Sequence, residues 1–498
     1  MISFSPRRLS ADRGTISLLP LPVGLGLIFG GVCVTASAVV GLLTDADRFT
    51  TTRISEVALG LAAAGIGSIV SRLQSDQPVT RAAAMAMFVG GWAALTGVGI
   101  LAFLLAGEVE SPLDAVFEAV SATTTTGFTT VADPSELSHS LRFLRVILPW
   151  ATGLGVLFVS AGVLPVAIAG AELLPQRQLD RRRQLVTTVA NTIRNVLGLY
   201  LILTLALGSA FALAGMSIFD AITYALSTAS TGGMANHADS LGFFDSVAIE
   251  WIASVGMVAA GGNLLVVWWG LRGRVGAVWR STELRLYLLI VVVGFIIVRL
   301  DSGLSSSDSA VAITSMISTT GLRSANWGSA GGFSIALLLI AGGVGAMSGS
   351  VGSGFRIARL ARIVLEVWRS LHRLLDPHSV RIVRIDGTAI DESSLSLTAG
   401  YLWMQTLALA ALSVLIHVTE FDVIATLSFV VAILSNVGVV LDGGQVTNHV
   451  SLAGWSQIVA IFGMLLGRLS IYPVLIAIAG FSRWLARLRP HRTAGASI

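Results

Sequence analysis

The sequence predicts an all-α, polytopic membrane protein in which four helix–loop–helix repeats follow two N-terminal transmembrane helices. Hydrophobic residues make up 54% of the 498 and charged residues only 12%, about half of the roughly 25% that is usual in soluble proteins. A pattern of Ser, Asp and Gly also recurs four times at a spacing of roughly a hundred residues, which indicates a repeated structural unit. The arginines, finally, gather in short segments between the apolar runs, as they do in loops on the cytoplasmic side of a membrane.

Residues 1–78 contain the two leading helices. Apolar runs at about 16–43 and 54–70 approach or exceed the ~20 residues that a helix needs to cross the hydrocarbon. Ala36-x-Ala38 makes a signal peptide conceivable. The first run is longer than the usual ~7–15 residues of a signal-peptide core, however, so we expect an uncleaved helix.

Each repeat then consists of an apolar span, a short helix with a loop, and a second span. The repeats occupy residues 79–174, 186–272, 282–375 and 395–498. The expected spans are 82–107, 141–173, 189–214, 243–271, 284–300, 330–354, 395–417 and 453–482, and the short helices with their loops cover 111–134, 217–239, 305–328 and 419–449. Residues 376–394 connect the last two repeats, and the alternation on both sides of Asp386-Gly387 predicts a small cytoplasmic hairpin. That connector either docks a partner or covers helix ends.

The repeated pattern has fixed offsets. In the first copy, Gly127 is preceded by Ser121, Asp114 and Ser111 at six, thirteen and sixteen residues. The same offsets recur in the second and third copies, which contain Ser217, Asp220, Ser227 and Gly233, and Ser305, Asp308, Ser315 and Gly321. The fourth copy ends in Ser435-Asn436-Val437-Gly438 and carries Thr419-x-x-Asp422 three residues further upstream.

This pattern has a physical interpretation. Ser/Thr-x-x-Asp before an apolar run predicts a helix N-terminus, where the hydroxyl caps backbone donors and the carboxylate faces the positive end of the helix dipole. About ten residues of helix follow, and the closing glycine allows the backbone to turn its carbonyls freely. A helix C-terminus followed by carbonyl-bearing backbone attracts cations. Four such units around an axis predict a cation filter.

Composition excludes several other classes of protein. Cys33 is the single cysteine, so the chain has no intramolecular disulfide and no multi-cysteine metal site. All 32 basic residues are Arg, which excludes the Walker A loop and lysine Schiff-base chemistry. The motifs H-E-x-x-H and G-x-S-x-G are absent. Membrane topology explains the net charge of +4 without nucleic acid.

The arginines also predict the orientation. Twenty-five of the 32 lie in segments 1–13, 71–81, 174–195, 272–285, 355–384 and 483–492. Such asymmetry puts both termini in the cytoplasm and the four glycine loops outside. Ten spans agree with that parity.

At this point the sequence resembles the Trk/Ktr/HKT superfamily of potassium transporters, and within it the TrkH branch. The resemblance rests on the four glycine segments together with Ala259-Ala-Gly-Gly-Asn-Leu264, Gly349-Ser-Val-Gly-Ser-Gly-Phe-Arg356 and Phe462-Gly-Met-Leu-Leu-Gly-Arg468. It implies a fold of four helix–pore-loop–helix units around a pore.

The resemblance also implies a K⁺ selectivity filter at Thr126, Gly127, Gly232, Gly233, Thr320, Gly321, Val437 and Gly438, with K⁺ held by the backbone carbonyls of Gly127, Gly233, Gly321 and Gly438. In the second repeat the shared Ser-to-Gly offset selects Gly233 over Gly232. Plant relatives with Ser at the first position favour Na⁺, so glycine in all four places implies K⁺.

The resemblance further implies a gate below the filter. Its expected residues are Gly345, Gly349, Ser350, Gly352, Gly354 and Arg468. Glycine at the density of residues 342–354 does not hold a stable helix, so we expect an unwound intramembrane segment; close helix packing through small residues is the alternative. Val351, Ser353 and Arg356 depart from the family pattern.

Two arginines lie within the expected pore elements, Arg468 in the final span and Arg323 in the third glycine loop. Arg468 is the only charge in an otherwise apolar final span, and such residues are functional by default; the resemblance puts it beneath the filter, and a purely structural ion pair is the alternative. Arg323 would repel K⁺ at the outer mouth if it faced the axis. We expect it to point away, towards an acidic neighbour such as Asp308.

We therefore expect a K⁺-conducting uptake subunit in a bacterial plasma membrane, embedded in the lipid bilayer. No residue is expected to perform covalent chemistry, so the protein is not an enzyme. The resemblance implies a homodimer with one pore per subunit and a cytoplasmic TrkA/RCK-type regulatory ring. Because this chain lacks G-x-G-x-x-G, any nucleotide (ATP/ADP or NAD) would bind the partner. The alternatives are a Na⁺-selective or ion-coupled (H⁺/Na⁺) symporter on the same scaffold, and a membrane-embedded enzyme. The enzyme would need Asp, His or Ser groups within the membrane, whereas the acidic residues here lie mostly at outer loop ends.

Overall fold

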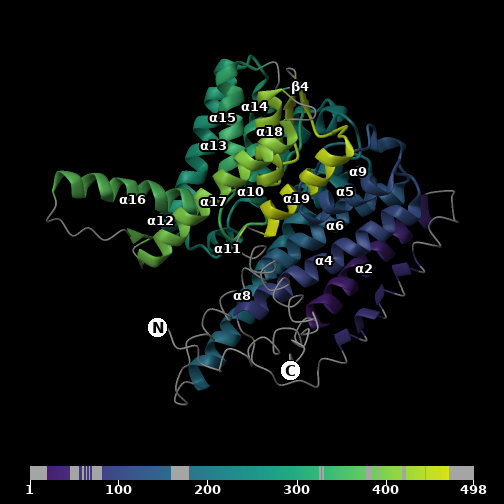
Figure 1. Cartoon of the computed structure of the whole chain (residues 1–498), viewed down its shortest axis with the longest axis horizontal. Coiled ribbons are helices and arrows are strands. Elements are labelled where there is room, and N and C mark those ends of the chain that lie inside the picture. The colour runs from purple at the N-terminus through teal and green to yellow at the C-terminus, as the bar shows by residue number, and fades with distance from the viewer. Residues whose placement is uncertain are drawn as a thin grey trace, which may run out of the picture.

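A computed structural model gives the fold. It describes residues 20–44, scattered positions between 55 and 69, and residues 81–158, 179–324, 327, 330–376, 384–386, 388–390, 392–417, 422–442, 445–469 and 471. The described chain is almost entirely helical, with the helices gathered into one bundle from which the long amphipathic helix α16 extends (Figure 1). The predicted all-α architecture is confirmed.

The apolar helices are those of a multi-pass membrane protein. In the described part of the chain, five helices are long and apolar enough to cross a membrane, and one bent pair makes a sixth. The five lie in α2 (Pro20–Thr44), α4 (Arg81–Ala106), α6 (His139–Phe158), α8 (Leu179–Leu213) and α17 (Glu392–His417). The first leading helix is α2, which packs along α4 and α6. In the second, predicted at 54–70, ten of the seventeen residues are described, and all ten are helical.

Four short helices match the four copies of the sequence pattern. They are α5 (Pro112–Thr123), α9 (Ile218–Ala229), α14 (Ser306–Ser318) and α18 (Val423–Ser435). The first three begin as predicted, because the hydroxyls of Ser111, Ser217 and Ser305 each accept a hydrogen bond from the Asp backbone N–H three residues later, at 3.1 Å.

The fourth helix begins differently from the prediction. Its N-cap is Asp422, whose Oδ1 accepts from the Ala425 N–H at 2.7 Å; Thr419, the expected cap, lies outside the described residues. Asp422 stands sixteen residues before Gly438, as Ser111 does before Gly127. The helix therefore has the same register as the other three, with an aspartate in place of serine at the cap.

The remaining helices complete the repeats. They are α10 (Val247–Gly261), α11 (Leu264–Leu271), α12 (Val275–Arg280), α13 (Thr282–Asp301), α15 (Gly332–Val344), α16 (Ile357–Leu375) and α19 (Gly454–Leu469), with 3₁₀ turns η1 (Pro134–Glu136) and η4 (Ser240–Phe244). The predicted continuous span 243–271 is wrong. The chain breaks between α10 and α11 and bends by 106°, because Gly262 leaves the helix and Asn263 caps the next one through its side-chain oxygen.

In the described part of the chain, two short hairpins interrupt the helices. The predicted one is confirmed as β1 (Arg384–Ile385) paired with β2 (Thr388–Ala389). Asp386 at its turn accepts a hydrogen bond from the Thr282 N–H at the start of α13, at 2.7 Å. The second hairpin, β3 (Val440–Asp442) with β4 (Gln445–Thr447), follows the fourth glycine loop and was not predicted.

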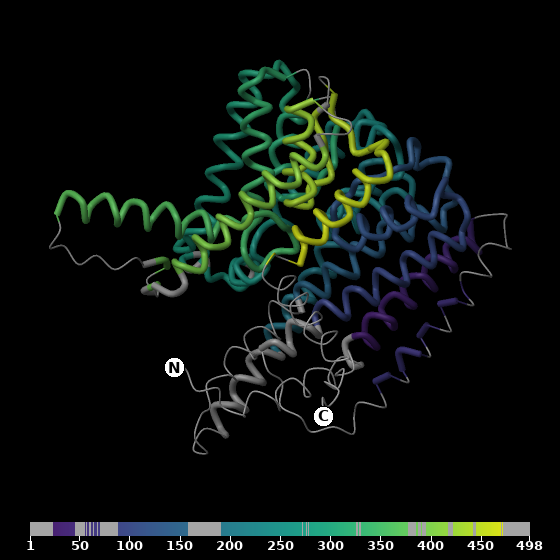
Figure 2. Tube along the Cα trace, in the orientation of Figure 1, coloured from purple at the N-terminus to yellow at the C-terminus, as the bar shows by residue number. Residues whose placement is uncertain are grey.

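The chain closes on itself so that its first and last repeats meet. Figure 2 shows the yellow trace of α19 crossing beside the blue trace of the first repeat, and α19 packs against α5. Beyond the loop of the first repeat, Thr129 forms a parallel β-bridge with His449 of the fourth. The repeats thus form a closed arrangement whose centre holds the short helices and their loops.

Candidate ion-conduction site

The four glycine loops share one unusual backbone conformation. Gly127, Gly233, Gly321 and Gly438 all have positive φ, between 67° and 91°. The residue two positions earlier is left-handed in every loop although it is never glycine; these residues are Thr125, Thr231, Thr319 and Asn436. The residue between each pair is not left-handed. Non-glycine residues in this region are strained and concentrate at functional sites.

The same hydrogen bond holds each loop to its own short helix. In every repeat the N–H of the residue before the glycine donates to the carbonyl five positions earlier, near the helix C-terminus. These bonds run from Thr126 to Ser121 (2.9 Å), Gly232 to Ser227 (2.9 Å), Thr320 to Ser315 (2.9 Å) and Val437 to Ala432 (3.0 Å). Each loop is therefore anchored to its own short helix in the same way.

The glycines lie directly against one another's loops and form a closed ring. A Cβ atom placed on Gly127 would lie 2.8 Å from the Gly232 carbonyl oxygen. A Cβ on Gly233 would overlap the Thr320 carbonyl, one on Gly321 the Val437 carbonyl, and one on Gly438 the Thr126 carbonyl. Each glycine therefore faces the backbone of the next repeat, and the fourth faces the first. We call these four residues the glycine ring.

Gly232 is not equivalent to the ring members. Its φ is not positive, and a Cβ there would meet Pro149 of α6 and Ser230 of its own repeat rather than the next loop. In the second repeat, Gly233 and not Gly232 is therefore the member of the glycine ring.

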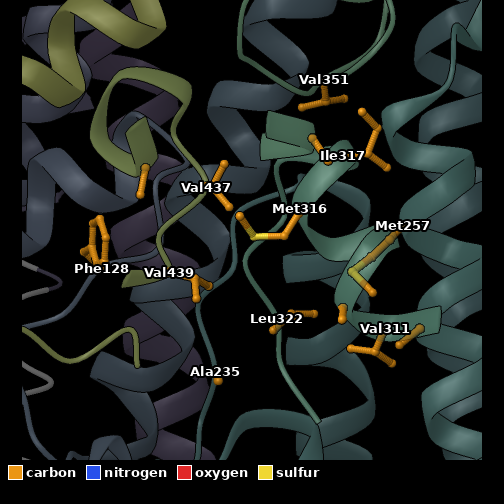
Figure 3. Close-up of a cluster of buried hydrophobic side chains, with 14 of the residues drawn as sticks. Phe128, Ala235, Met257, Val311, Met316, Ile317, Leu322, Val351, Val437 and Val439 are labelled. Carbon is orange, nitrogen blue, oxygen red and sulfur yellow. The ribbon is translucent and has the colours of Figure 1, made fainter. Parts of the chain in front are cut away.

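The residue after each ring glycine is apolar and buried. These residues are Phe128, Met234, Leu322 and Val439, each at most 1% exposed. Figure 3 shows Phe128, Leu322 and Val439 within the surrounding cluster of hydrophobic side chains. These four side chains therefore pack into the protein beside the glycine ring.

Beneath the ring, the glycine-rich segment of the third repeat is unwound. Helix α15 ends at Val344 and α16 begins at Ile357, with Gly345 at φ 71° between them. The predicted loop began at Gly342, which is wrong by three residues because Gly342 and Gly343 remain helical. Gly352 packs against the Ser318 carbonyl.

The loop is bonded both to the ring and to the helix break. The Ser353 N–H donates to the hydroxyl of Thr319, two residues before Gly321, at 2.9 Å. The Met347 N–H donates to the Gly261 carbonyl at 3.0 Å, and a Cβ on Gly349 would lie 3.0 Å from the Asn263 side chain. Two of the sequence motifs singled out above, 259–264 and 349–356, therefore contact each other.

Arg468 reaches this loop from α19. Gly463 and Gly467 allow α19 to pack closely on α18, where a Cβ on Gly467 would lie 2.5 Å from the Leu434 carbonyl. The Arg468 Nη1 then donates to the Val351 carbonyl at 2.9 Å and to the Ser353 hydroxyl at 2.8 Å. Among the described residues no carboxylate lies within ion-pair distance of Arg468, so the structural ion pair considered as an alternative is not formed there.

Arg323 does not pair with Asp308 as expected. Its Nη2 donates to the Ala238 carbonyl of the second repeat. Asp308 instead accepts from the Ser324 and Ser305 hydroxyls, at 2.7 and 2.6 Å. The Arg323 guanidinium thus binds the second repeat. The Asp308 carboxylate links the third glycine loop to α14, the short helix of the same repeat.

One charged pair beside the ring was not singled out from the sequence. Glu118 of α5 accepts from the Arg145 Nε of α6 at 3.1 Å, and the two side chains are 0% and 2% exposed. Arg145 was recognisable only as one of seven arginines outside the basic segments. The site has no cluster of metal-ligating side chains, because the described residues contain no group of three or more His, Cys, Asp or Glu positioned for a metal.

Comparison with known proteins identifies the family of the chain. The TrkH family, described as "Cation transport protein", matches residues 57–299 and 278–482. The chain is 31% identical over 408 residues to the Trk system potassium uptake protein TrkH of Vibrio parahaemolyticus, across 77% of this chain and 82% of that protein. It is 30% identical over 405 residues to the protein of the same name from Salmonella typhimurium, with the same two shares.

A solved structure of a TrkH protein has the same fold. The crystal structure of the potassium transporter TrkH from Vibrio parahaemolyticus superposes with a TM-score of 0.81 and 27% identity, covering 93% of this chain and 98% of that one. These relatives are named as potassium transporters and uptake proteins, not as enzymes. The chain belongs to the TrkH family of cation transport proteins.

Proposed function

We propose that this protein is the K⁺-conducting membrane subunit of a Trk-type uptake system in a bacterial plasma membrane. The observation that carries the proposal is the glycine ring, in which four loops with the same pattern of left-handed residues meet at the C-termini of four short helices. Helix C-termini and backbone carbonyls both attract cations. K⁺ would be held by the carbonyls at Gly127, Gly233, Gly321 and Gly438, with Thr126, Gly232, Thr320 and Val437 contributing the adjacent layer.

The loop beneath the ring is proposed as the gate. Gly345, Gly349, Ser350, Gly352 and Gly354 form it, and Arg468 holds it through the Val351 carbonyl and the Ser353 hydroxyl. Ser353 is one of the positions that depart from the family pattern, and its hydroxyl supplies one of these two bonds. An arginine held beneath a cation filter opposes passage until the loop moves.

For the wider assembly we propose a homodimer with a cytoplasmic TrkA/RCK-type ring that binds the regulatory nucleotide. The name of the relative, a protein of a Trk system for potassium uptake, supports a system with more than one component. The inward-negative membrane potential would drive uptake, at about 2.3 kcal/mol per charge per 100 mV. We place both termini in the cytoplasm on the arginine distribution.

The test is potassium uptake by a transport-deficient cell, with and without a co-expressed regulatory subunit. Rescue of growth at low K⁺ is the expected result, and no rescue by a correctly inserted protein would refute the proposal. Fluxes in proteoliposomes distinguish the alternative, a Na⁺-selective or ion-coupled symporter, because that protein would prefer Na⁺ or require a second ion gradient.

A further inference from the structure

The buried pair Glu118–Arg145 lies at the backbone that follows the glycine ring. Glu118 uses Oε2 for Arg145 and Oε1 for the first loop. Oε1 accepts from the Thr129 hydroxyl at 2.6 Å and from the Thr130 N–H at 2.8 Å. Thr129 and Thr130 are the second and third residues after Gly127.

Arg145 extends the same contact to the second loop. Its Nη1 donates to the Ala235 carbonyl at 3.5 Å, and Ala235 is the second residue after Gly233. One ion pair therefore touches the same position of two neighbouring loops. In Figure 3, Ala235 lies lower in the view than Leu322 and Val439, whereas Val351 of the glycine-rich segment lies at the top.

Thr129 also joins the fourth repeat to this network. Its N–H donates to the Asn448 carbonyl at 3.0 Å, and its own carbonyl accepts from the Val450 N–H at 2.9 Å. A displacement of Glu118 would therefore move the exit of the first loop and strain its junction with the fourth repeat.

In the second and third repeats, a single carboxylate of the short helix holds the backbone that follows the ring glycine. Asp220 accepts from the Asn236 amide at 2.9 Å, and Asp308 accepts from the Ser324 hydroxyl at 2.7 Å. In each case a carboxylate of the short helix binds the third residue after the ring glycine. The first repeat does this with Glu118, deep inside the protein, and neutralises the buried charge with Arg145.

A buried ion pair is a weak source of stability, since well-packed apolar residues of similar volume often stabilise a protein as much or more. Its directed hydrogen bonds, by contrast, fix where the partner groups lie. We propose that Glu118 and Arg145 are positioning residues that set the backbone beyond Gly127 and Gly233 and thereby control discrimination between K⁺ and Na⁺. This inference rests on the proposed function of the glycine ring.

The experiment replaces both charges together. The double variant Glu118→Leu/Arg145→Met leaves no buried charge unpaired but removes every hydrogen bond that the pair makes to the loops. We expect it to insert with a wild-type thermal midpoint in detergent and to lose at least tenfold in the K⁺/Na⁺ permeability ratio measured in proteoliposomes. The matched control is Glu366→Leu/Arg369→Met, which removes the ion pair on α16 and should leave the ratio unchanged.

A second variant covers the case in which the double variant does not fold. Thr129→Val keeps the side-chain shape and removes only the hydroxyl that donates to Glu118, so a severalfold loss of selectivity is expected. A wild-type ratio in the folded double variant, or in Thr129→Val, would overturn the positioning role alone. A wild-type protein without any preference for K⁺ would overturn the proposed function and this inference with it.

Discussion

Replacing Gly127 by serine tests the glycine ring at its least crowded position. Gly127 has φ 91°, and a Cβ there would lie 2.8 Å from the Gly232 carbonyl oxygen and 3.1 Å from the Gly233 Cα. Contacts below 3.0 Å are essentially never observed for real Cβ atoms, and left-handed backbone costs an L-residue roughly 1–2 kcal/mol. A shift of the backbone would relieve both the close contact and the left-handed strain. That shift would displace the carbonyls that are proposed to hold the ion.

The expected loss of selectivity can be expressed as the free energy by which a carbonyl filter prefers K⁺ over Na⁺. If the displacement removes about 1.4 kcal/mol of the preference for K⁺, the permeability ratio falls tenfold. We expect Gly127→Ser to insert and dimerise but to lose at least that much K⁺/Na⁺ discrimination in proteoliposomes. Changes at Gly233, Gly321 and Gly438 should do more damage, because their neighbouring carbonyls are closer still.

The matched control is serine at Gly232, which adds the same atoms one residue from the ring. There the new Cβ would meet Pro149 and Ser230 side-chain atoms at 2.8 and 2.9 Å, and φ is not positive. Some loss of stability is expected, with a smaller change in selectivity. Wild-type selectivity in Gly127→Ser, or a loss confined to Gly232→Ser, would show that the ring is assigned to the wrong residues.

Three further predictions concern the gate, the packing of α19 and the topology. Arg468→Ala, or deletion of residues 345–350, should raise K⁺ flux and weaken its dependence on the regulatory partner; unchanged uptake in both folded variants would reduce these features to packing. Gly467→Ala should lower the thermal midpoint, since overpacking costs about 1–3 kcal/mol, whereas Gly97→Ala, with no atom within 4 Å of the new Cβ, should not. Single cysteines should react with an impermeant reagent in intact cells at positions 135 and 239 but not at 183, 280 or 373, and native Cys33 is buried. Labelling at 183 or 280 would contradict the arginine-based orientation.

The parts of the fold that follow local rules could be predicted from the sequence. Ser-x-x-Asp specifies a helix start through contacts within four residues, and three of the four starts are as expected. The fourth start differs from the expectation because the Asp422 carboxylate accepts from the backbone donor that a serine hydroxyl satisfies in the other three repeats. The sixteen-residue offset from Gly438 marks this start, whereas the residue type does not.

The features that were missed depend on contacts across the chain. The bend between α10 and α11 lies in an apolar stretch of ordinary length, and what stabilises it is partly the Met347–Gly261 hydrogen bond to another repeat. Glu118 and Arg145 are 27 residues apart, so each appears in the sequence as an isolated charge. Arg323 binds Ala238, 85 residues away in the sequence, whereas Asp308, the acidic residue closer in sequence, was the expected partner.

Closing a ring with one continuous chain makes the junction between first and last repeats different from the other three. At that junction the Asn436 side chain donates to the Thr126 hydroxyl at 2.9 Å and to the Met464 carbonyl of α19 at 3.0 Å, and the Thr129–His449 bridge adds backbone pairing. Asn436 is also the left-handed residue of its loop, and asparagine tolerates that conformation better than most residues. The same side chain therefore serves the loop conformation, the junction and the helix that carries Arg468. A change in the position of α19 is thereby coupled to the glycine ring by direct hydrogen bonds, which gives the proposed gate and the proposed filter a common structural element.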